Sequence, residues 1–402
     1  MELTISSSQL LNLAHHYGTP LYVYHANTIM RQYHKMVEAF NNLDVKIFYA
    51  CKALTNIHVL KYVHSLGCNI DCSSSNEVML ALKAGFTADR ILYTSNGISF
   101  SEIEAVADTG AFVNIDSLSN LEKFGSKFGN TYPVGVRLRL NIMAGGHMKI
   151  ATGHDKSKFG IPAEQIDLLK AIVDEYNINI HTLHIHTGSD ISDAKVFMQG
   201  LEFLFEILPA FPKVKVLDLG GGFKVPYHPS EKETDLKNLS TALENAMREH
   251  PATKDRNLQL WFEPGKFLVS QCGYLLTTVN VLKEQENLSI VGIDTGLNHL
   301  IRPMMYEAYH HISNLSSSGH DEKKYMITGN ICETDTFAEE CILPETQEGD
   351  ILAIHNAGAY GFEMSSSYNA RFRPAEVLVV EDQPTLIRRR ENLDDLLRAQ
   401  ML

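Results

Sequence analysis

Residues 45–52 read VKIFYACK, a short apolar run that ends on a lysine. Seven similar runs follow, and most residues with obvious chemistry lie at their carboxyl ends. The runs are CNIDCSSS (68–75), ILYTSN (91–96), FVNIDS (112–117), VGVRLRLN (134–141), HTLHIHTGS (181–189), VLDLGGG (216–222) and LQLWFEPG (258–265). Amphipathic stretches such as SNEVMLALKAG (75–85) lie between them. Strand and helix therefore alternate as in a (β/α)8 barrel, whose active sites occupy the carboxyl face of the strands.

A second, strand-rich part follows the barrel pattern. The chain has 402 residues, whereas a barrel needs roughly 250. After residue 269 the helical pattern stops, and runs such as GYLLTTVNVLKE (273–284) and AEVLVVED (375–382) favour strands. At the start, a serine-capped helix over QLLNLAHHYG (9–18) precedes the strand-like PLYVYH (20–25). We predict an α/β protein: a TIM-like barrel at 25–269 and a β-rich domain formed by 1–24 and 270–402.

Charge argues against a polyanionic partner. The net charge is −13, and lysines and arginines are scattered along the chain, so we expect no binding to nucleic acid. The one basic run, Arg388 to Arg390, leads into ENLDDLL. We interpret it as the solvated face of a terminal helix.

Cysteine spacing and hydropathy favour the cytoplasm. The six cysteines form no CxxC pair and no zinc-ligand spacing, which favours reduced thiols. The N-terminus lacks a basic segment followed by an apolar core, and the most apolar stretch, LEFLFEILPAF (201–211), is interrupted by two glutamates. We expect a cytoplasmic protein that binds no membrane.

Lys52 is the first candidate for chemistry. Phe48 and Ala50 share its face by two-residue alternation, so its amine would project into the barrel mouth. A desolvated lysine loses its proton easily and can form a Schiff base with a carbonyl. The alternative is an ordinary surface cation at a strand end.

Three consecutive glycines, Gly220, Gly221 and Gly222, follow the seventh run. Their bare N–H groups could wrap an anion, and barrels often hold phosphate after strands seven and eight. A tight strand-to-helix turn also needs glycine. A lysine and a phosphate cradle on one barrel face are together what pyridoxal phosphate requires.

Glu263, His186 and Ser189 fit the same cofactor. A carboxylate beside a pyridine nitrogen keeps it protonated, whereas an N-cap or surface acid is the alternative role for Glu263. His186 could stack on a flat ring and Ser189 could bind phosphate. His184 and His186 share a strand face and could instead ligate zinc, but no third ligand of fixed spacing follows, so we predict no metal.

The β-rich part contributes further candidates. Cys332 would be a competent proton donor if exposed to the cofactor, although most cysteines are small core residues. Arg302 and Tyr306 could together hold a carboxylate, with a structural ion pair as the alternative.

Taken in order, these motifs resemble the alanine-racemase-like barrel decarboxylases that depend on pyridoxal 5'-phosphate. The motifs are Tyr49–Lys52, His186–Ser189, Gly220–Gly222, Glu263–Gly265, Arg302–Tyr306, Cys332–Glu333 and Gly358–Gly361. The resemblance extends from GTPLYVY (18–24) to RFRPAEVLV (371–379), nearly the whole chain.

The resemblance implies roles for individual residues. Lys52 would bind the cofactor covalently, His186 would stack on its ring, and Glu263 would face the pyridine nitrogen. Ser189 and the three glycines would bind the phosphate. The remaining implied contacts are Arg139 and Asp71 as supporting polar residues, Tyr360 at both cofactor and substrate, and Cys332 with Glu333 reaching the active site of a partner subunit. A homodimer with shared active sites follows. The sequence departs from the family at Lys266, where arginine is usual; lysine cannot form a planar bidentate pair with a substrate carboxylate or a phosphate.

Substrate charge distinguishes the decarboxylases of this family. Arg302 with Tyr306 suits a distal carboxylate and Glu333 an ammonium group, so we expect meso-2,6-diaminopimelate as the amino-acid substrate, with L-lysine and carbon dioxide as products, and Cys332 as the proton donor. Decarboxylation of ornithine, arginine or carboxynorspermidine is the alternative. A racemase would want arginine rather than Glu263 at the ring nitrogen, and a silent cofactor-binding homologue would not need an intact Lys52. The glycine-containing stretch 141–160 is a candidate lid.

Overall fold

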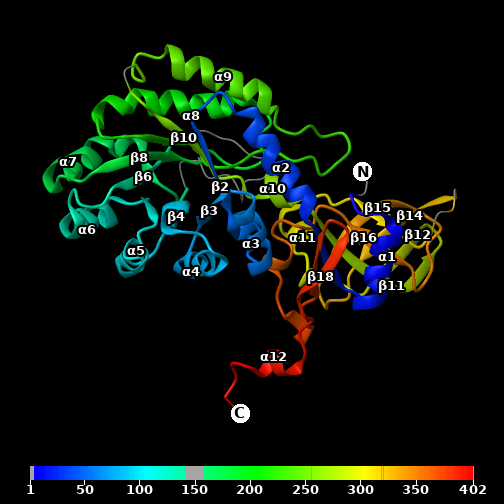
Figure 1. The fold of residues 1–402 in the computed structure, drawn as a ribbon. Helices are drawn as coiled ribbons and strands as arrows, with labels where there is room; N and C mark the ends of the chain where they lie inside the picture. The colour runs from blue at the N-terminus through cyan, green and yellow to red at the C-terminus, as the bar shows by residue number, and fades with distance from the viewer. Residues whose placement is uncertain (1–3, 141–156, 255, 318, 320, 402) are drawn as a thin grey trace. The chain divides into compact units, whose positions relative to one another are not determined.

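The computed structural model describes residues 4–140, 157–254, 256–317, 319 and 321–401 (Figure 1). The chain divides into two compact units. One, the barrel unit, comprises Gln32–Val225 and Lys232–Phe267. The other, the β unit, comprises the chain up to Arg31, the segment Pro226–Glu231 and Leu268–Leu402. The short segment 226–231 thus belongs to the β unit although it lies within the range 25–269 expected for the barrel.

The barrel unit is built on eight parallel strands. They are β2 (Val45–Ala50), β3 (Asn69–Cys72), β4 (Ile91–Thr94), β5 (Phe112–Ile115), β6 (Val134–Arg139), β8 (Ile180–Ile185), β9 (Val216–Asp218) and β10 (Gln259–Phe262). Each strand pairs with the next, β5 pairs with β6, and β10 pairs back with β2. The ring is therefore closed, and the two-residue β7 (Ile161–Pro162) pairs with β6 outside it. This confirms the predicted barrel, with one strand in each of the eight runs.

Helices surround this ring of strands (Figure 1). They are α2 (Ala26–Ala39), α3 (Ile57–Ser65), α4 (Ser75–Ala84), α5 (Phe100–Ala107), α6 (Leu118–Phe128), α7 (Ile166–Tyr176), α8 (Ala194–Ile207), α9 (Leu236–Glu249) and the short α10 (Lys266–Val269). Several begin at a side-chain cap: Asn56 accepts a hydrogen bond from the His58 amide, and Ser74 accepts one from the Glu77 amide. These two caps start α3 and α4 soon after β2 and β3, whereas α9 begins only at Leu236, well after β9 ends at Asp218.

The barrel interior changes character along the strands. An apolar cluster of Phe48, Leu92, Val216 and Trp261 fills part of it, and the Phe48 and Trp261 rings lie 4.5 Å apart. Two residues further along two of these strands, the same face carries Asp218 and Glu263. A packed lower layer therefore supports polar groups near the carboxyl ends.

The β unit is a mixed sheet that recruits the first strand of the chain. Its strands are β1 (Leu21–His25), β11 (Gly273–Gln285), β12 (Leu288–Ile293), β13 (Ile312–Asn314), β14 (Glu322–Thr328), β15 (Thr336–Pro344), β16 (Ile351–Ile354), β17 (Ala375–Val380) and β18 (Gln383–Arg388). The order is β15-β14-β12-β11-β1-β17-β18, with β16 on β11 and β13 on β16. Helix α1 (Ser7–Tyr17), capped by Ser6, packs Leu10 and Leu13 into its core. A barrel followed by a β-rich domain is thus confirmed.

Short helices complete the two units. Helices α11 (Arg302–Tyr306) and α12 (Leu393–Leu397) belong to the β unit. The 3-10 helices are η1 (Cys51–Ala53), η2 (Ala88–Arg90), η4 (Ala163–Gln165), η5 (Leu208–Ala210), η6 (Phe362–Met364) and η7 (Tyr368–Ala370).

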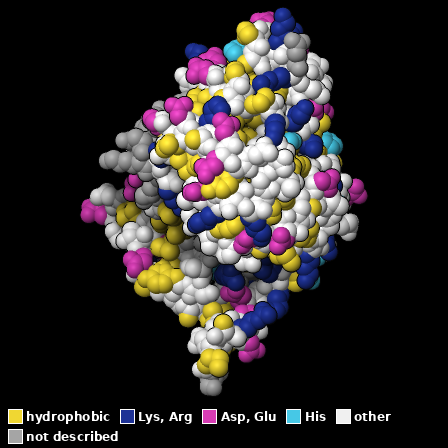
Figure 2. All heavy atoms as spheres, turned by 90° about the vertical axis from the view of Figure 1, so that its left-hand side faces the viewer, with side chains coloured by type: hydrophobic (Ala, Val, Ile, Leu, Met, Phe, Trp, Pro, Cys, Tyr) yellow, Lys and Arg dark blue, Asp and Glu magenta, His cyan; other side chains and the backbone are white. Residues whose placement is uncertain are grey.

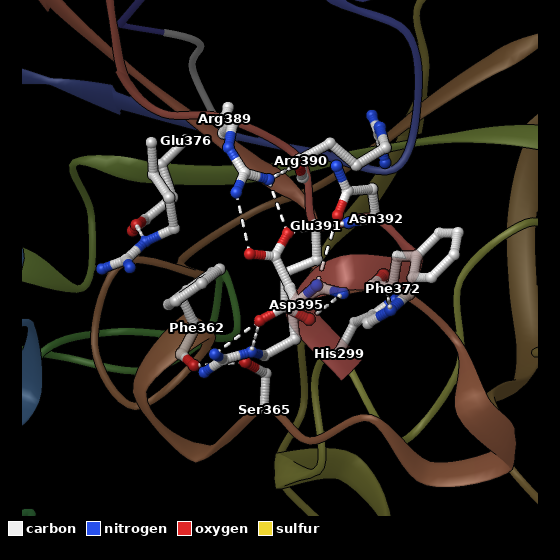
Figure 3. A network of polar contacts seen from close by, with 12 residues as sticks. His299, Phe362, Ser365, Phe372, Glu376, Arg389, Arg390, Glu391, Asn392 and Asp395 are labelled. Carbon is white, nitrogen blue, oxygen red and sulfur yellow. Dashed lines mark hydrogen bonds and ion pairs between the residues drawn. The ribbon is translucent and has the colours of Figure 1, made fainter. Parts of the chain in front are cut away.

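The interpretation of Arg388–Arg390 as the face of a helix was wrong. Arg388 ends strand β18 and pairs with Glu376, whose side chain is fully buried, and its guanidinium lies 4.6 Å from the centre of the Phe362 ring. Arg389 forms a bidentate pair with Asp395 at 2.5 and 2.8 Å (Figure 3). Arg388, through Glu376, and Arg390, which donates hydrogen bonds to the Tyr17 and Gly18 carbonyls, connect this segment to other parts of the β unit, whereas Arg389 pairs within the C-terminal segment itself.

The charged surface carries both signs. Figure 2 shows acidic and basic side chains interspersed over the face in view. No helix in the described part of the chain is both long enough and apolar enough to cross a membrane.

Candidate active site

Lys52 and Asp71 meet at the carboxyl end of the barrel. Lys52 lies in η1 directly after β2, Asp71 lies in the adjacent strand β3, and the Lys52 Nζ is 2.9 Å from the Asp71 Oδ2. The Asp71 carboxyl is buried, whereas 42% of the lysine side chain is exposed. Burial raises the pKa of Asp71 to about 7 even though Lys52 opposes the shift. The buried Asp71 carboxyl thus holds the amine of a lysine whose side chain is partly exposed to solvent.

Glu263 directly follows strand β10 and lies beside a histidine and a second acid. Its Oε1 lies 3.5 Å from the His184 Nε2. His184, Asp218 and Glu263 each offer one nitrogen or oxygen atom that could ligate a metal, and these three atoms lie within 4.8 Å of one another. Burial and the charge of Glu263 raise the pKa of Asp218 well above its usual value. Burial opposes ionisation of Glu263 as well, but His184 and Lys52 hold the pKa of that carboxyl below its usual range. Of two neighbouring acids, Glu263 therefore keeps the negative charge and Asp218 the proton.

His186 lies against the glycine segment. The Gly221 amide donates a hydrogen bond to the His186 Nδ1 at 3.2 Å. Burial and the nearby charge of Arg137 together lower the pKa of His186 to about 3, so the imidazole is neutral at physiological pH. A neutral ring with one acceptor nitrogen engaged by a backbone amide has a fixed orientation.

The three glycines form a cradle that no side chain could enter. A Cβ at Gly221 would lie 2.4 Å from the Glu263 carbonyl oxygen, and one at Gly222 would lie 2.4 Å from the Gly188 carbonyl oxygen. Gly220 and Gly222 also have φ values of +68° and +99°, which favour glycine. Exposed backbone of this kind is suited to binding an anion.

Unpaired polar groups point to a ligand near this cradle. The Ser189 Oγ, the Thr187 Oγ1 and the Glu263 Oε1 are buried and have no hydrogen-bond partner among the described residues. Buried polar atoms normally have partners. A phosphate on the glycines and Ser189, and a protonated ring nitrogen beside the acids, would supply them, so these residues fit pyridoxal phosphate.

Lys266 and Arg139 lie in the same unit. The Lys266 Nζ donates a hydrogen bond to the Asp190 Oδ1. Arg139 donates one to the Ser157 carbonyl, while its buried Nε has no hydrogen-bond partner within the described residues. The adjoining candidate lid, 141–160, lies largely outside the described residues, which omit 141–156.

Sequence reasoning missed three residues of this group. It weighed His184 only as a zinc ligand, gave Asp218 no role, and chose Arg139 without considering Arg137. Arg137 is buried, and its guanidinium lies 4.8 Å from the centre of the Phe159 ring. Burial lowers the pKa of Arg137, and nearby acids including Glu263 and Asp116 oppose that shift. Strand alternation could have found two of them, because His184 shares a face with His186, and Arg137 with Arg139.

In the β unit, Arg302 is surrounded by tyrosines. Its guanidinium lies 5.6, 5.7 and 5.9 Å from the ring centres of Tyr227, Tyr306 and Tyr360. The side chain is buried, and its Nε has no hydrogen-bond partner in the described part of the chain. Tyr306 was predicted to act together with Arg302, and Tyr360 was predicted to contact cofactor and substrate, whereas Tyr227 was missed because it comes from the distant segment 226–231. A buried arginine of this kind is suited to a carboxylate.

Cys332 and Glu333 form a second group in the β unit. Cys332 is exposed. Its amide donates to the Asn369 Oδ1 at 2.9 Å, and the Asn369 side chain donates to its Sγ at 3.1 Å. The Tyr368 hydroxyl donates to Glu333 at 2.8 Å. The thiol and the carboxylate are therefore held on the surface by Tyr368 and Asn369 of η7, which sequence reasoning did not identify.

The closed barrel, the lysine after its first strand and the glycine cradle define a barrel enzyme that binds pyridoxal phosphate. The family model of the pyridoxal-dependent decarboxylases, pyridoxal binding domain, matches residues 26–270. The chain belongs to this family, and pyridoxal 5'-phosphate is its cofactor.

Within that family the chain is similar to diaminopimelate decarboxylases. The enzyme of Methanothermobacter thermautotrophicus is 37% identical, over 99% of this chain and 95% of the relative. That of Aquifex aeolicus is 35% identical, over 98% and 94%. Among solved structures, diaminopimelate decarboxylase from Helicobacter pylori complexed with L-lysine superposes with a TM-score of 0.88 and 30% identity, over 97% of this chain and 98% of the other.

Proposed function

We propose that this protein decarboxylates meso-2,6-diaminopimelate to L-lysine and carbon dioxide. The observation that carries the proposal is the combination of Lys52, Glu263 and the glycine cradle in one barrel with 32–37% identity to diaminopimelate decarboxylases over nearly the full length. The proposed role of Arg302 fits the same substrate.

Each proposed role follows from the position of a side chain. When bound, the cofactor accepts the electron pair left on Cα as the bond to the carboxylate breaks. Lys52 would attach the cofactor through its amine and release the product, and Asp71 would orient that amine. Glu263, kept charged beside His184, would hold a proton on the ring nitrogen. His186 would limit the tilt of the ring.

The substrate assignment rests on charge. Diaminopimelate carries a carboxylate and an ammonium group at its far end, whereas ornithine and arginine carry only a cation there. Arg302, with Tyr306 and Tyr360 around it, would bind that carboxylate, and Glu333 would bind the ammonium group. An arginine aimed at a purely cationic end would repel it.

The proposed working form is a cytoplasmic homodimer. Cys332 and Glu333 are exposed, which suits residues that complete the site of a partner subunit. Cys332 would then return a proton to Cα after carbon dioxide has left.

The first experiment is product analysis. The purified protein with pyridoxal phosphate is offered meso-diaminopimelate, ornithine, lysine, arginine and carboxynorspermidine separately, and carbon dioxide and the amine product are measured. We expect lysine from diaminopimelate and little turnover of the other four. Turnover of a diamine precursor would overturn the substrate assignment, and no turnover of any would overturn the proposed activity.

Shared active sites are tested by mixing two inactive variants. Lys52→Ala and Cys332→Ala would each lose most activity alone. Co-expressed, they would form mixed dimers with one intact site, and random pairing would restore about a quarter of wild-type activity. No recovery in isolated mixed dimers would show that each chain supplies its own cysteine.

A further inference from the structure

The loops after β8, β9 and β10 close on one another around the glycine cradle. The Ile191 amide donates to the Gly222 carbonyl at 2.8 Å, which fixes the 188–191 segment against the glycines. The Glu263 amide donates to the Gly220 carbonyl at 2.9 Å, which fixes the start of the 263–266 segment on their other side. Asp190 and Lys266 lie on these two segments, so their ion pair bridges the loops on either side of the cradle.

This ion pair is largely shielded from water. The Lys266 side chain is 12% exposed and that of Asp190 22% exposed. Asp190 also has a φ of +59°, a left-handed conformation that only glycine, asparagine and aspartate adopt with ease. The residue before it, Ser189, has the buried hydroxyl without a partner among the described residues. A carboxylate and an ammonium group thus stand beside the position proposed for the phosphate.

We propose that Asp190 sets the affinity of the cradle for the phosphate group of the cofactor. The inference rests on the proposed function, because it uses the assignment of Ser189 and the glycines to that phosphate. Asp190 already neutralises much of the charge of Lys266, and its own carboxylate repels the incoming phosphate dianion. The cradle is therefore close to neutral before the cofactor binds, and cofactor affinity is lower than Lys266 alone would give.

The test is Asp190→Asn, which removes the charge but keeps a side chain of similar size that tolerates the left-handed conformation. The cofactor is removed with hydroxylamine, and the dissociation constants of pyridoxal phosphate and of pyridoxal are measured by absorbance. We expect Asp190→Asn to bind pyridoxal phosphate about tenfold more tightly, since a repulsion between nearby like charges is lost. Pyridoxal, which has no phosphate, should bind equally to both proteins.

A double-mutant cycle with Lys266→Met separates charge from positioning. If Asp190 acts on the phosphate directly, Asp190→Asn tightens binding in the Lys266→Met background too. If Asp190 only holds Lys266 in place, Asp190→Asn weakens binding alone and has no effect in that background, which would overturn the proposal. An equal change in pyridoxal binding would overturn it as well.

Inorganic phosphate provides an independent probe. It should compete with pyridoxal phosphate for the cofactor-free enzyme, and compete more strongly in Asp190→Asn. Wild-type protein that binds no pyridoxal phosphate would refute the proposed function itself. Wild-type protein that binds it as tightly as Asp190→Asn would refute only this inference.

Discussion

At the scale of single residues, the site works by dividing charge between neighbouring acids. Asp218 and Glu263 lie too close for both to ionise in a buried site, and the hydrogen bond from the Gly220 amide at 2.9 Å does not offset the burial of Asp218. Glu263 carries the negative charge because His184 and Lys52 lower its pKa. The same environment that keeps Asp218 neutral therefore leaves one carboxylate to meet a ring nitrogen.

Gly222 offers the sharpest test at this scale. Its Cβ would lie 2.4 Å from the Gly188 carbonyl oxygen, so Gly222→Ala should displace the 188–191 segment and abolish cofactor binding. Gly349 is a matched control, because its φ of +91° resembles the +99° of Gly222 but nothing lies within 4 Å of its Cβ. Both variants should lose about 1–2 kcal/mol of stability from the backbone strain. The measurement is the absorbance of bound cofactor in the purified proteins. We expect Gly349→Ala to retain the cofactor, and retention of the cofactor in Gly222→Ala would contradict the packing argument.

At the scale of elements, the sequence predicted what depends on local pattern. Each of the eight apolar runs became a strand, because β-branched and aromatic residues bounded by turn residues need no distant partner to be recognised. It failed where the partner is distant in sequence. Arg388 was misread since Glu376 and Phe362, which engage it, are not its neighbours on a helix face. Tyr227 and Tyr368 were missed for the same reason, whereas Lys52, Glu263 and the glycines could be proposed from sequence because they follow strand ends.

Helix α6 shows how one element depends on its neighbour. A Cβ at Gly125 would lie 2.6 Å from the Tyr176 Cβ at the end of α7. The absence of a side chain at Gly125 therefore lets α6 and α7 approach each other closely. Alanine favours a helix over glycine by about 0.5–1 kcal/mol, but overpacking costs about 1–3 kcal/mol. Gly125→Ala should therefore lower the midpoint of thermal unfolding. The control is Ser126→Ala, at an exposed position on the same helix, which should leave the midpoint unchanged or raise it. A higher midpoint in both variants would show that the contact between Gly125 and Tyr176 is not tight.

At the scale of the whole molecule, buried neutral histidines make stability depend on pH. Burial lowers the pKa of His299 to about 4 and that of His355 to about 3, both in the β unit. The unfolded chain takes up protons on these side chains below pH 6.5, whereas the folded chain does not until a much lower pH. Stability is therefore highest above pH 6.5 on this account and falls as the pH decreases toward 4.

His355→Gln isolates one share of this dependence, because glutamine can replace the hydrogen bond between the His355 Nε2 and the Ser313 hydroxyl at 2.9 Å. At pH 5 the wild-type histidine costs about 2 kcal/mol relative to pH 7, so the variant should lose correspondingly less stability between these pH values. Urea unfolding is best followed by circular dichroism, since the only tryptophan, Trp261, lies in the barrel unit and reports on that unit. His58→Gln, at an exposed position, should retain the full wild-type dependence. Equal slopes for wild type and His355→Gln would show that His355 is protonated in the folded protein as readily as in the unfolded chain.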